Sequence, residues 1–440
     1  MSIPAPPAPR RVPFPVVDEV ARHCLQDEEP ETVHIEVHLP GTPDPARLTA
    51  AFAEALHRHP RILMREAAGP WYRRRYEWEL TRGPDVDVVT FPPPGPDALG
   101  DARTRALTHA PPLTASPPIR LEVVREREDG AAVLFLTINH TALDGPACLR
   151  VLATAAEIYG GHDDAPGAPP PHRAPPGAPG PALRGPSPWT PPARVAPGTP
   201  DTSPALSPGV SPGVSPGNGL LVADLPVPHR PAGAPYTVND QLMAATALMI
   251  THWNREHGAR PRPVRITMPV DDRPRGADMP IGNGTRLVEV TFEPQELTST
   301  GIPLLLHRTS VRTRALKALD RPQLGHGAAL LTAPLAPVAW RAAVTRGLRR
   351  AAAPWTSTTL LSNIGRVPYP LDFGDAGRAH AVWFSAPARM PRGLTVTTAS
   401  TAGRLHLALR WSRTLLGPGD GDRLRDLFEH YLHATQEATP

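Results

Sequence analysis

The sequence contains little cysteine and almost no lysine, and each shortage excludes a class of protein. Its 440 residues include two cysteines, Cys24 and Cys148, which match no CxxC or zinc-ligand spacing. This predicts two free thiols in a reducing cytoplasm. Lys317 is the only lysine in the sequence, so the amine that a Walker loop or a pyridoxal phosphate enzyme requires is missing.

Long apolar runs and strong net charge are also missing. No apolar run approaches the roughly 18 residues of a membrane span, and prolines interrupt the N-terminus where a signal peptide would be apolar. The net charge is only +4, with acidic and basic residues interspersed, so nucleic acid is not an expected partner. Without a GxSxG elbow the chain has no serine-hydrolase signature. We expect a cytoplasmic monomer with no integral membrane segment.

The patterning that is present divides the chain in two. A chain of this length is longer than a single hydrophobic core usually accommodates. Strand-like and helix-like patterns alternate over residues 1–161 and again over 219–440. These are the predicted N-terminal and C-terminal lobes of an α/β protein. Residues 162–218 are rich in proline, glycine and serine, which predicts a disordered linker. A passive tether and a segment for a proline-binding partner are both open roles for it.

One segment, Asn139-His140-Thr141-Ala142-Leu143-Asp144-Gly145, carries the strongest chemical signal. It lies between a predicted strand over 132–138 and a predicted helix over 147–159, so rigid elements would hold it. A histidine four residues before an aspartate is compatible with a metal site, a structural histidine, or a general base that the aspartate orients. Gly145 would allow a tight turn close to substrate, or simply begin the helix.

Further short motifs follow in a definite order along the chain. They are Arg58-His59-Pro60, Pro118-Ile119-Arg120, Thr237-Val238-Asn239-Asp240, Pro269-Val270-Asp271-Asp272-Arg273, Gly282-Asn283, and Ser362-Asn363-Ile364-Gly365. In this order, and with the HxxxDG segment, they resemble the chloramphenicol acetyltransferase-like acyltransferases. That superfamily includes nonribosomal peptide synthetase condensation domains, plant BAHD acyltransferases and bacterial wax ester synthase/diacylglycerol acyltransferases. The resemblance covers nearly the whole chain outside the linker.

The resemblance implies two lobes with mixed sheets flanked by helices, and an active-site tunnel between them. It implies an acyltransferase that moves an acyl group from a thioester to the hydroxyl or amine of a small-molecule acceptor, in secondary metabolism or lipid biosynthesis. The donor would be acyl-coenzyme A or an acyl or peptidyl carrier protein. His140 would be the general base, since histidine titrates near neutral pH. Neither a bound cofactor nor a metal would be needed.

The resemblance also implies roles for other residues of the site. Asp144 would point away from the imidazole and pair with an arginine to fix the turn. Arg273 is the candidate partner, although a surface arginine would explain it as well. Ser362 and Asn363 would line the tunnel or donate to the oxyanion, unless they are simply a polar strand end.

Two interpretations remain open beside the catalytic one. Asn139 stands where the strict motif has its first histidine, which favours a catalytically silent relative that docks a carrier-bound intermediate. A basic stretch could receive the phosphates of coenzyme A or the acidic helix of a carrier protein, or be a solvated helix face. It consists of Arg341, Arg346, Arg349 and Arg350.

Overall fold

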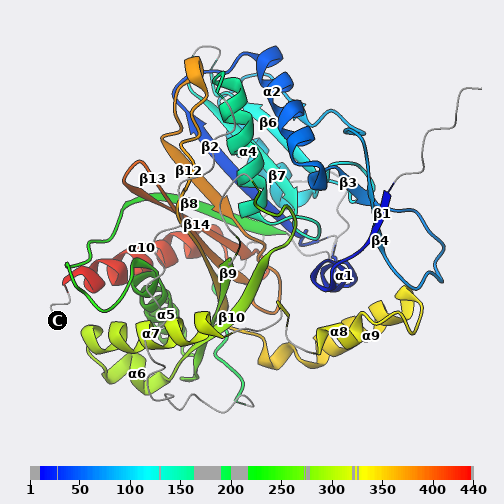
Figure 1. The fold of residues 1–440 in the computed structure, drawn as a ribbon. Coiled ribbons are helices and arrows are strands. Elements are labelled where there is room, and N and C mark those ends of the chain that lie inside the picture. Colours follow the sequence, from blue (N-terminus) through cyan, green and yellow to red (C-terminus); the bar gives the residue numbers. More distant parts are fainter. Residues whose placement is uncertain are drawn as a thin grey trace, which may run out of the picture.

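The computed structural model describes residues 10–26, 28–127, 130–162, 190–199, 217–271, 273, 278–319, 323–324 and 327–437. Within these residues the strands form a five-stranded, a six-stranded and a three-stranded sheet, and helices cover the two larger sheets (Figure 1). The architecture is the mixed α/β fold predicted from the sequence.

The first large sheet has the strand order β12-β2-β7-β6-β5. Its centre is the antiparallel pair β2 and β7, with Thr32 opposite Asn139. Helices α2 and α4 cover one face, and α3 covers the other. The elements of this lobe are β2 (Thr32–Leu39), α2 (Pro45–Arg58), η1 (Pro60–Ile62), β5 (Val89–Thr90), α3 (Ala98–Thr108), β6 (Ile119–Val124), β7 (Ala132–Asn139), α4 (Gly145–Tyr159) and β12 (Ala381–Ser385).

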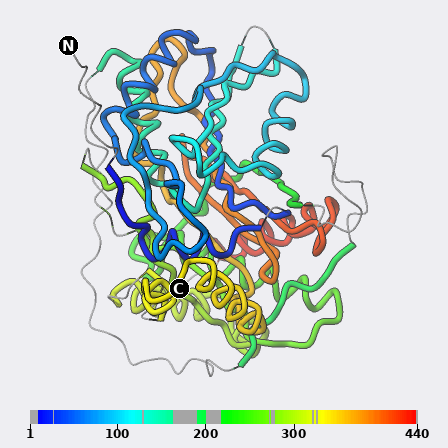
Figure 2. Tube along the Cα trace, turned by 90° about the vertical axis from the view of Figure 1, so that its right-hand side faces the viewer, coloured from blue at the N-terminus to red at the C-terminus, as the bar shows by residue number. Residues whose placement is uncertain are grey.

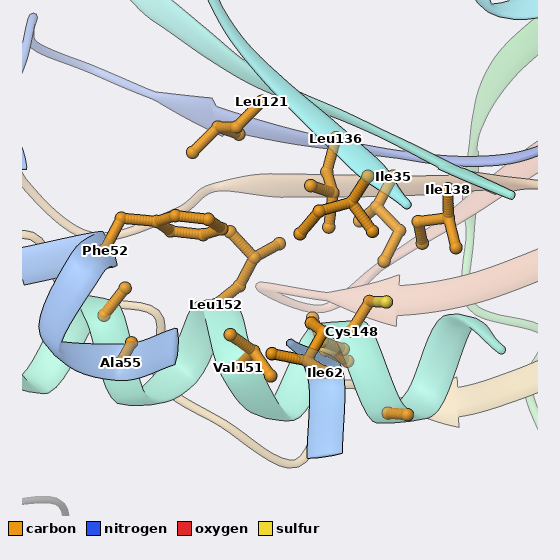
Figure 3. Packing of buried hydrophobic residues seen from close by; sticks show 14 of the residues in the cluster. Ile35, Phe52, Ala55, Ile62, Leu121, Leu136, Ile138, Cys148, Val151 and Leu152 are labelled. Atoms are coloured by element: carbon orange, nitrogen blue, oxygen red, sulfur yellow. The ribbon is translucent and has the colours of Figure 1, made fainter. Parts of the chain in front are cut away.

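Local sequence signals explain how the helices of this lobe begin and pack. The Asp44 carboxylate accepts a hydrogen bond from the Arg47 amide at 2.7 Å, and Pro45 opens α2. Figure 3 shows Phe52 of α2, Leu152 of α4 and Leu136 of β7 in one apolar layer between the helices and the sheet. Cys148 points into the same layer. As predicted, Cys148 and Cys24 are free thiols.

The second large sheet has the order β10-β9-β11-β13-β14-β8. Helices α5 and α10 pack against each other and on this sheet, and α7 lies beside them. Thr237 and Asp240 form a reciprocal capping box at the start of α5. The elements are β8 (Asn218–Pro226), α5 (Val238–Glu256), β9 (Val264–Asp271), β10 (Thr285–Phe292), α6 (Pro294–Ser299), α7 (Ile302–Ala318), β11 (Thr359–Arg366), β13 (Leu394–Thr401), β14 (Arg404–Ser412) and α10 (Pro418–Glu437).

A third group of elements lies beside the two larger sheets. Helix α1 packs against α9, and the two views agree that α8 and α9 lie next to N-terminal residues (Figures 1 and 2). The group consists of β1 (Arg10–Pro13), α1 (Val16–His23), β3 (Met64–Glu66), β4 (Glu77–Leu80), α8 (Ala328–Leu331), α9 (Val338–Ala351) and η2 (Ala353–Trp355). The short helix η3 (Gly374–Ala376) belongs to the first lobe, where the Gly41 amide donates to the Ala376 carbonyl at 3.0 Å.

The division into two consecutive lobes differs from the structure at one strand. Strand β12, expected in the lobe of residues 219–440, is instead the edge strand of the first sheet and pairs with β2 along its whole length. Val367, Leu371 and Phe373 also pack in the first core. The reason is that β2 needs a partner on the edge that β7 does not cover.

The predicted linker is partly packed against the protein. Residues 163–189 and 200–216 lie outside the described residues, but residues 190–199 follow the second lobe. The Ala196 amide donates to the Asn254 side chain at 2.8 Å, and the Trp253 indole donates to the Ala196 carbonyl at 2.9 Å. The predicted disorder therefore does not extend to residues 190–199.

Candidate active site

The HxxxDG segment forms the turn between β7 and α4, as the sequence predicts. Every residue of β7 is buried, and the strand ends at Asn139. The Ala142 amide then donates to the Asn139 carbonyl at 3.1 Å and closes the turn. The Asp144 carboxylate accepts from the Ala147 amide at 3.0 Å and so caps α4, which begins at Gly145. A buried strand and a capped helix therefore fix the position of His140.

His140 is half-buried, and its ring is oriented by the backbone of its own turn. The Nδ1 atom lies 2.9 Å from the Leu143 carbonyl oxygen. Because a carbonyl oxygen can only accept, Nδ1 carries a proton, and in the neutral imidazole the lone pair is therefore on Nε2. The backbone amide of His140 donates to the Glu31 carbonyl at 2.8 Å. The ring is thus held in the tautomer that a general base at Nε2 requires.

Asp144 points away from the imidazole and forms the predicted pair with Arg273. The Arg273 Nη2 atom donates to both carboxylate oxygens at 2.9 Å, and the Gly284 amide donates to Oδ2 at 2.9 Å. Asp144 is only 2% exposed. Since its oxygens are occupied by Arg273, Gly284 and the helix cap, His140 and Asp144 form neither a triad nor a shared metal site.

Arg273 is held in place by a second carboxylate and by the backbone. Its Nε donates to Asp271 at 2.9 Å, and Nη1 donates to the Gly282 carbonyl at 2.9 Å. Burial lowers the pKa of the guanidinium, but the charges of Asp144 and Asp271 outweigh burial and raise it. A Cβ at Gly284 would lie 2.4 Å from the Arg273 Cδ. Glycine at this position allows the arginine to reach the motif.

Asn139 braces the turn through its side-chain amide. Its amide nitrogen donates to the Pro111 carbonyl at 2.9 Å, and its amide oxygen accepts from the Thr141 amide at 3.1 Å. The residue is 4% exposed. The position is therefore a structural one that an asparagine satisfies with both ends of its side chain.

A second set of contacts to the turn was not predicted. The Asn283 side chain donates to the carbonyls of His140 at 3.2 Å and Thr141 at 3.0 Å, and to the Asp18 carboxylate at 2.9 Å. The Trp78 indole donates to the other oxygen of Asp18 at 2.8 Å. Burial raises the pKa of Asp18 to about 7, although these hydrogen bonds lower it. Asn283 belongs to the Gly-Asn motif, which was the one available signal for this network.

Glu31 is another residue near His140 that the sequence did not single out. Its carboxylate forms an ion pair with Arg389 at 2.5 Å. Burial raises the pKa of Glu31, but the positive charge of Arg389, together with those of Arg349 and Arg410, outweighs burial and holds the pKa below its usual value. Arg389 lies in the C-terminal half of the chain, so this pair links the two halves beside the motif.

The remaining predicted residues have mainly structural contacts. A Cβ at Gly145 would lie 3.2 Å from the Phe384 ring, so Gly145 allows α4 to approach β12. Ser362 and Asn363 are half-buried on β11. The Asn363 amide donates to Asn239 at 3.2 Å and accepts from the Gly365 amide at 2.9 Å. These bonds brace a β-bulge in β11 and do not reach the motif turn.

Comparisons with known proteins identify one relative by sequence and several proteins of the same fold. No model of a known protein family matches the chain. Uncharacterized protein Rv2305 of Mycobacterium tuberculosis (strain H37Rv) is 30% identical over 389 residues, which cover 82% of this chain and 84% of that protein.

Three solved structures share the fold at low sequence identity. The first condensation domain of the CDA synthetase matches with a TM-score of 0.63 at 14% identity, over 97% of each chain. TRI3 trichothecene 15-O-acetyltransferase from Fusarium sporotrichioides gives 0.62 at 11% identity, over 97% of this chain and 95% of that one. The wax ester synthase/diacylglycerol acyltransferase from Marinobacter aquaeolei VT8 gives 0.59 at 15% identity, over 96% and 98%.

Proposed function

Because this chain belongs to the same family as the mycobacterial protein Rv2305 and has the chloramphenicol acetyltransferase-like fold, we propose that it is a thioester-dependent acyltransferase with His140 as general base. The donor is acyl-coenzyme A or an acyl or peptidyl carrier protein, and the acceptor is the hydroxyl or amine of a small molecule. Structural neighbours whose names describe acetyl transfer to oxygen and wax ester synthesis support this class of reaction.

The observation that carries the proposal is the orientation of the His140 ring. The Leu143 carbonyl fixes the proton on Nδ1, and the half-buried ring keeps Nε2 available. Asp144 is bound to Arg273 and has no part in this hydrogen bond. A carbonyl therefore takes the orienting role that an aspartate has in a serine-hydrolase triad.

The proposed reaction has two steps. Nε2 removes the proton from the acceptor O–H or N–H as that atom attacks the thioester carbonyl carbon, and a tetrahedral oxyanion forms. The carbon–sulfur bond then breaks, and the thiolate leaves with the proton from Nε2. A tunnel between the two lobes would bring donor and acceptor to the ring from opposite sides. The acyl group passes directly from sulfur to the acceptor.

The alternative of a catalytically silent relative loses its main support. Asn139, which favoured that interpretation, occupies a buried bracing position whose side-chain bonds go to Pro111 and Thr141 and not to the imidazole of His140. A silent relative would also be expected to bury the ring in apolar side chains, whereas His140 is half-buried.

The test is acceptor-dependent release of thiol from a panel of acyl-coenzyme A and acyl-carrier-protein donors, with alcohols and amines as acceptors. His140→Ala should lower the rate by about 100-fold to 10,000-fold, the usual contribution of a general base. His57→Ala is the matched control, since His57 is an exposed histidine of α2. Unchanged turnover in a folded His140→Ala protein would refute the assignment.

A further inference from the structure

Helix α9 presents an apolar stripe that the described part of the chain does not cover. Trp340, Val344 and Leu348 recur at four-residue spacing and are all exposed, Trp340 at 68%. The opposite face of α9 packs against α1. There Arg341 forms a buried ion pair with Glu19 at 2.8 Å, and Thr345 contacts His23 at 3.3 Å. The stripe therefore faces outward and does not belong to the core.

Arginines border this stripe. Arg346 and Arg350 are exposed and lie one turn apart on α9, and Arg346 also donates to the His23 carbonyl at 3.3 Å, whereas Arg341 is buried in the pair with Glu19. The four-arginine stretch recognised in the sequence is thus not one surface. From residue 321 to residue 371 the chain contains no aspartate or glutamate. The positive charges of α9 have no acidic neighbours within this part of the sequence.

A loop from the N-terminal half extends the same surface. The Val338 amide donates to the Arg73 carbonyl at 2.8 Å, and the Arg341 side chain donates to the Arg74 carbonyl at 2.6 Å. This contact places Trp71 and Tyr72 next to the start of α9, and Trp71 is 73% exposed. Arg74 and Arg75 follow them and are exposed as well.

The connection between α8 and α9 contributes aliphatic side chains. Leu330 lies in α8 and is exposed. Leu335 lies in the turn that follows and is 87% exposed. Figure 1 shows α8 and α9 at the edge of the molecule, beside the loop before β4. We define the arginine–tryptophan surface as the exposed side chains of residues 71–75 and 330–350.

We propose that the arginine–tryptophan surface attaches the protein to an anionic lipid bilayer. Tryptophan, tyrosine and leucine on a projecting surface, bordered by arginine, match the composition of interfacial membrane anchors. Arginines near an anionic bilayer gain about 1 kcal/mol each. Exposed large apolar side chains that lie together on one surface mark an interaction site more often than isolated ones do.

A peripheral contact of this kind does not require a membrane span. In the described part of the chain, no helix combines the length and apolarity needed to cross a bilayer. The surface also reaches the motif through a short path. Helix α9 packs on α1, and Asp18 of α1 binds Asn283, which binds the His140 carbonyl.

The experiment is flotation of the full-length protein with vesicles of phosphatidylcholine alone and of phosphatidylcholine with phosphatidylglycerol. The wild type should float with the anionic vesicles. Arg346→Gln/Arg350→Gln should bind them about 30-fold more weakly, which corresponds to about 1 kcal/mol per lost charge. Trp71→Ala/Trp340→Ala should weaken binding by about tenfold or more. All four side chains are exposed, and circular dichroism checks that the variants are folded.

Arg127→Gln/Arg378→Gln is the matched control. It removes two exposed arginines near the loop of residues 40–42, where the Thr42 hydroxyl donates to Gly130 and the Gly41 amide to Ala376. Its vesicle binding should equal that of the wild type. Failure of the wild type to float, or equal loss in control and test variants, overturns the proposal. Two other results also overturn it. One is that the protein does not bind vesicles and Trp340→Ala changes its oligomeric mass in solution; the other is that the protein does not bind vesicles but binds an acidic carrier protein.

Discussion

Replacing Asp144 with asparagine tests whether this aspartate has a structural or a catalytic role. The carboxylate is buried and accepts hydrogen bonds from the Arg273 guanidinium and from the amides of Gly284 and Ala147. In Asp144→Asn one oxygen becomes an NH₂ group, which faces donors and cannot accept from them. Each buried donor that loses its acceptor costs about 1–3 kcal/mol, and breaking a buried ion pair costs about 3–5 kcal/mol in total. We expect Asp144→Asn to lower the free energy of unfolding by about 3–5 kcal/mol.

Urea unfolding followed by tryptophan fluorescence measures this loss. Asp224→Asn is the matched control, because Asp224 pairs with Arg404 at 3.0 Å on the surface. Exposed pairs are worth less than about 1 kcal/mol. If Asp144→Asn were as mild as the control but slowed acyl transfer about 10,000-fold, the aspartate would be acting as in a triad. That outcome would refute the structural role derived from the Arg273 contact.

Two further predictions concern the side chains that brace the turn. Asn139→Leu should lower the free energy of unfolding by about 2–4 kcal/mol, because the Pro111 carbonyl and the Thr141 amide both lose a buried partner. An Asn139→Leu protein as stable as the wild type in urea titrations would contradict the bracing role. Asp18 has a folded-state pKa of about 7 against an ordinary value of 3.8. The folded protein therefore binds the Asp18 proton more tightly than the unfolded chain does. The free energy of unfolding falls as the pH rises between these two values. Relative to Asp18→Asn, the wild type should lose about 3 kcal/mol of unfolding free energy between about pH 5 and pH 8, and a pH-independent difference in urea titrations would exclude this linkage.

Much of the candidate site follows from the sequence because its signals are local. The strand, turn and helix around His140 show in the hydrophobic pattern and in the capping aspartate. The pairing of Asp144 with Arg273, which 129 residues separate, was implied by the resemblance to the acyltransferase superfamily and not by any local pattern. The roles of Asp18, Glu31 and Asn283 could not be predicted, because a side chain that bonds a distant backbone carbonyl or a distant charge has no periodic signature.

The same limit applies to the fold. The short apolar run of β12 is equally compatible with either sheet, so its place beside β2 depends on long-range pairing that the sequence pattern does not encode. Residues 190–199 show a different failure. Their proline-rich composition predicts no burial, yet Ala193, Val195 and Ala196 are buried beside α5. Hydrogen bonds with the side chains of Asn254 and Trp253 hold this segment in place, although its composition gives it few large apolar side chains to bury.

The place of β12 also has a consequence for how the protein is made. The ribosome releases residues 32–39 long before residues 381–385, so the nascent first sheet has an open edge at β2 until the chain is almost complete. The N-terminal half produced alone would keep that edge and tend to pair with another copy. A chain cut between its two halves would instead behave as a strand acceptor and a strand donor, which reassemble when mixed.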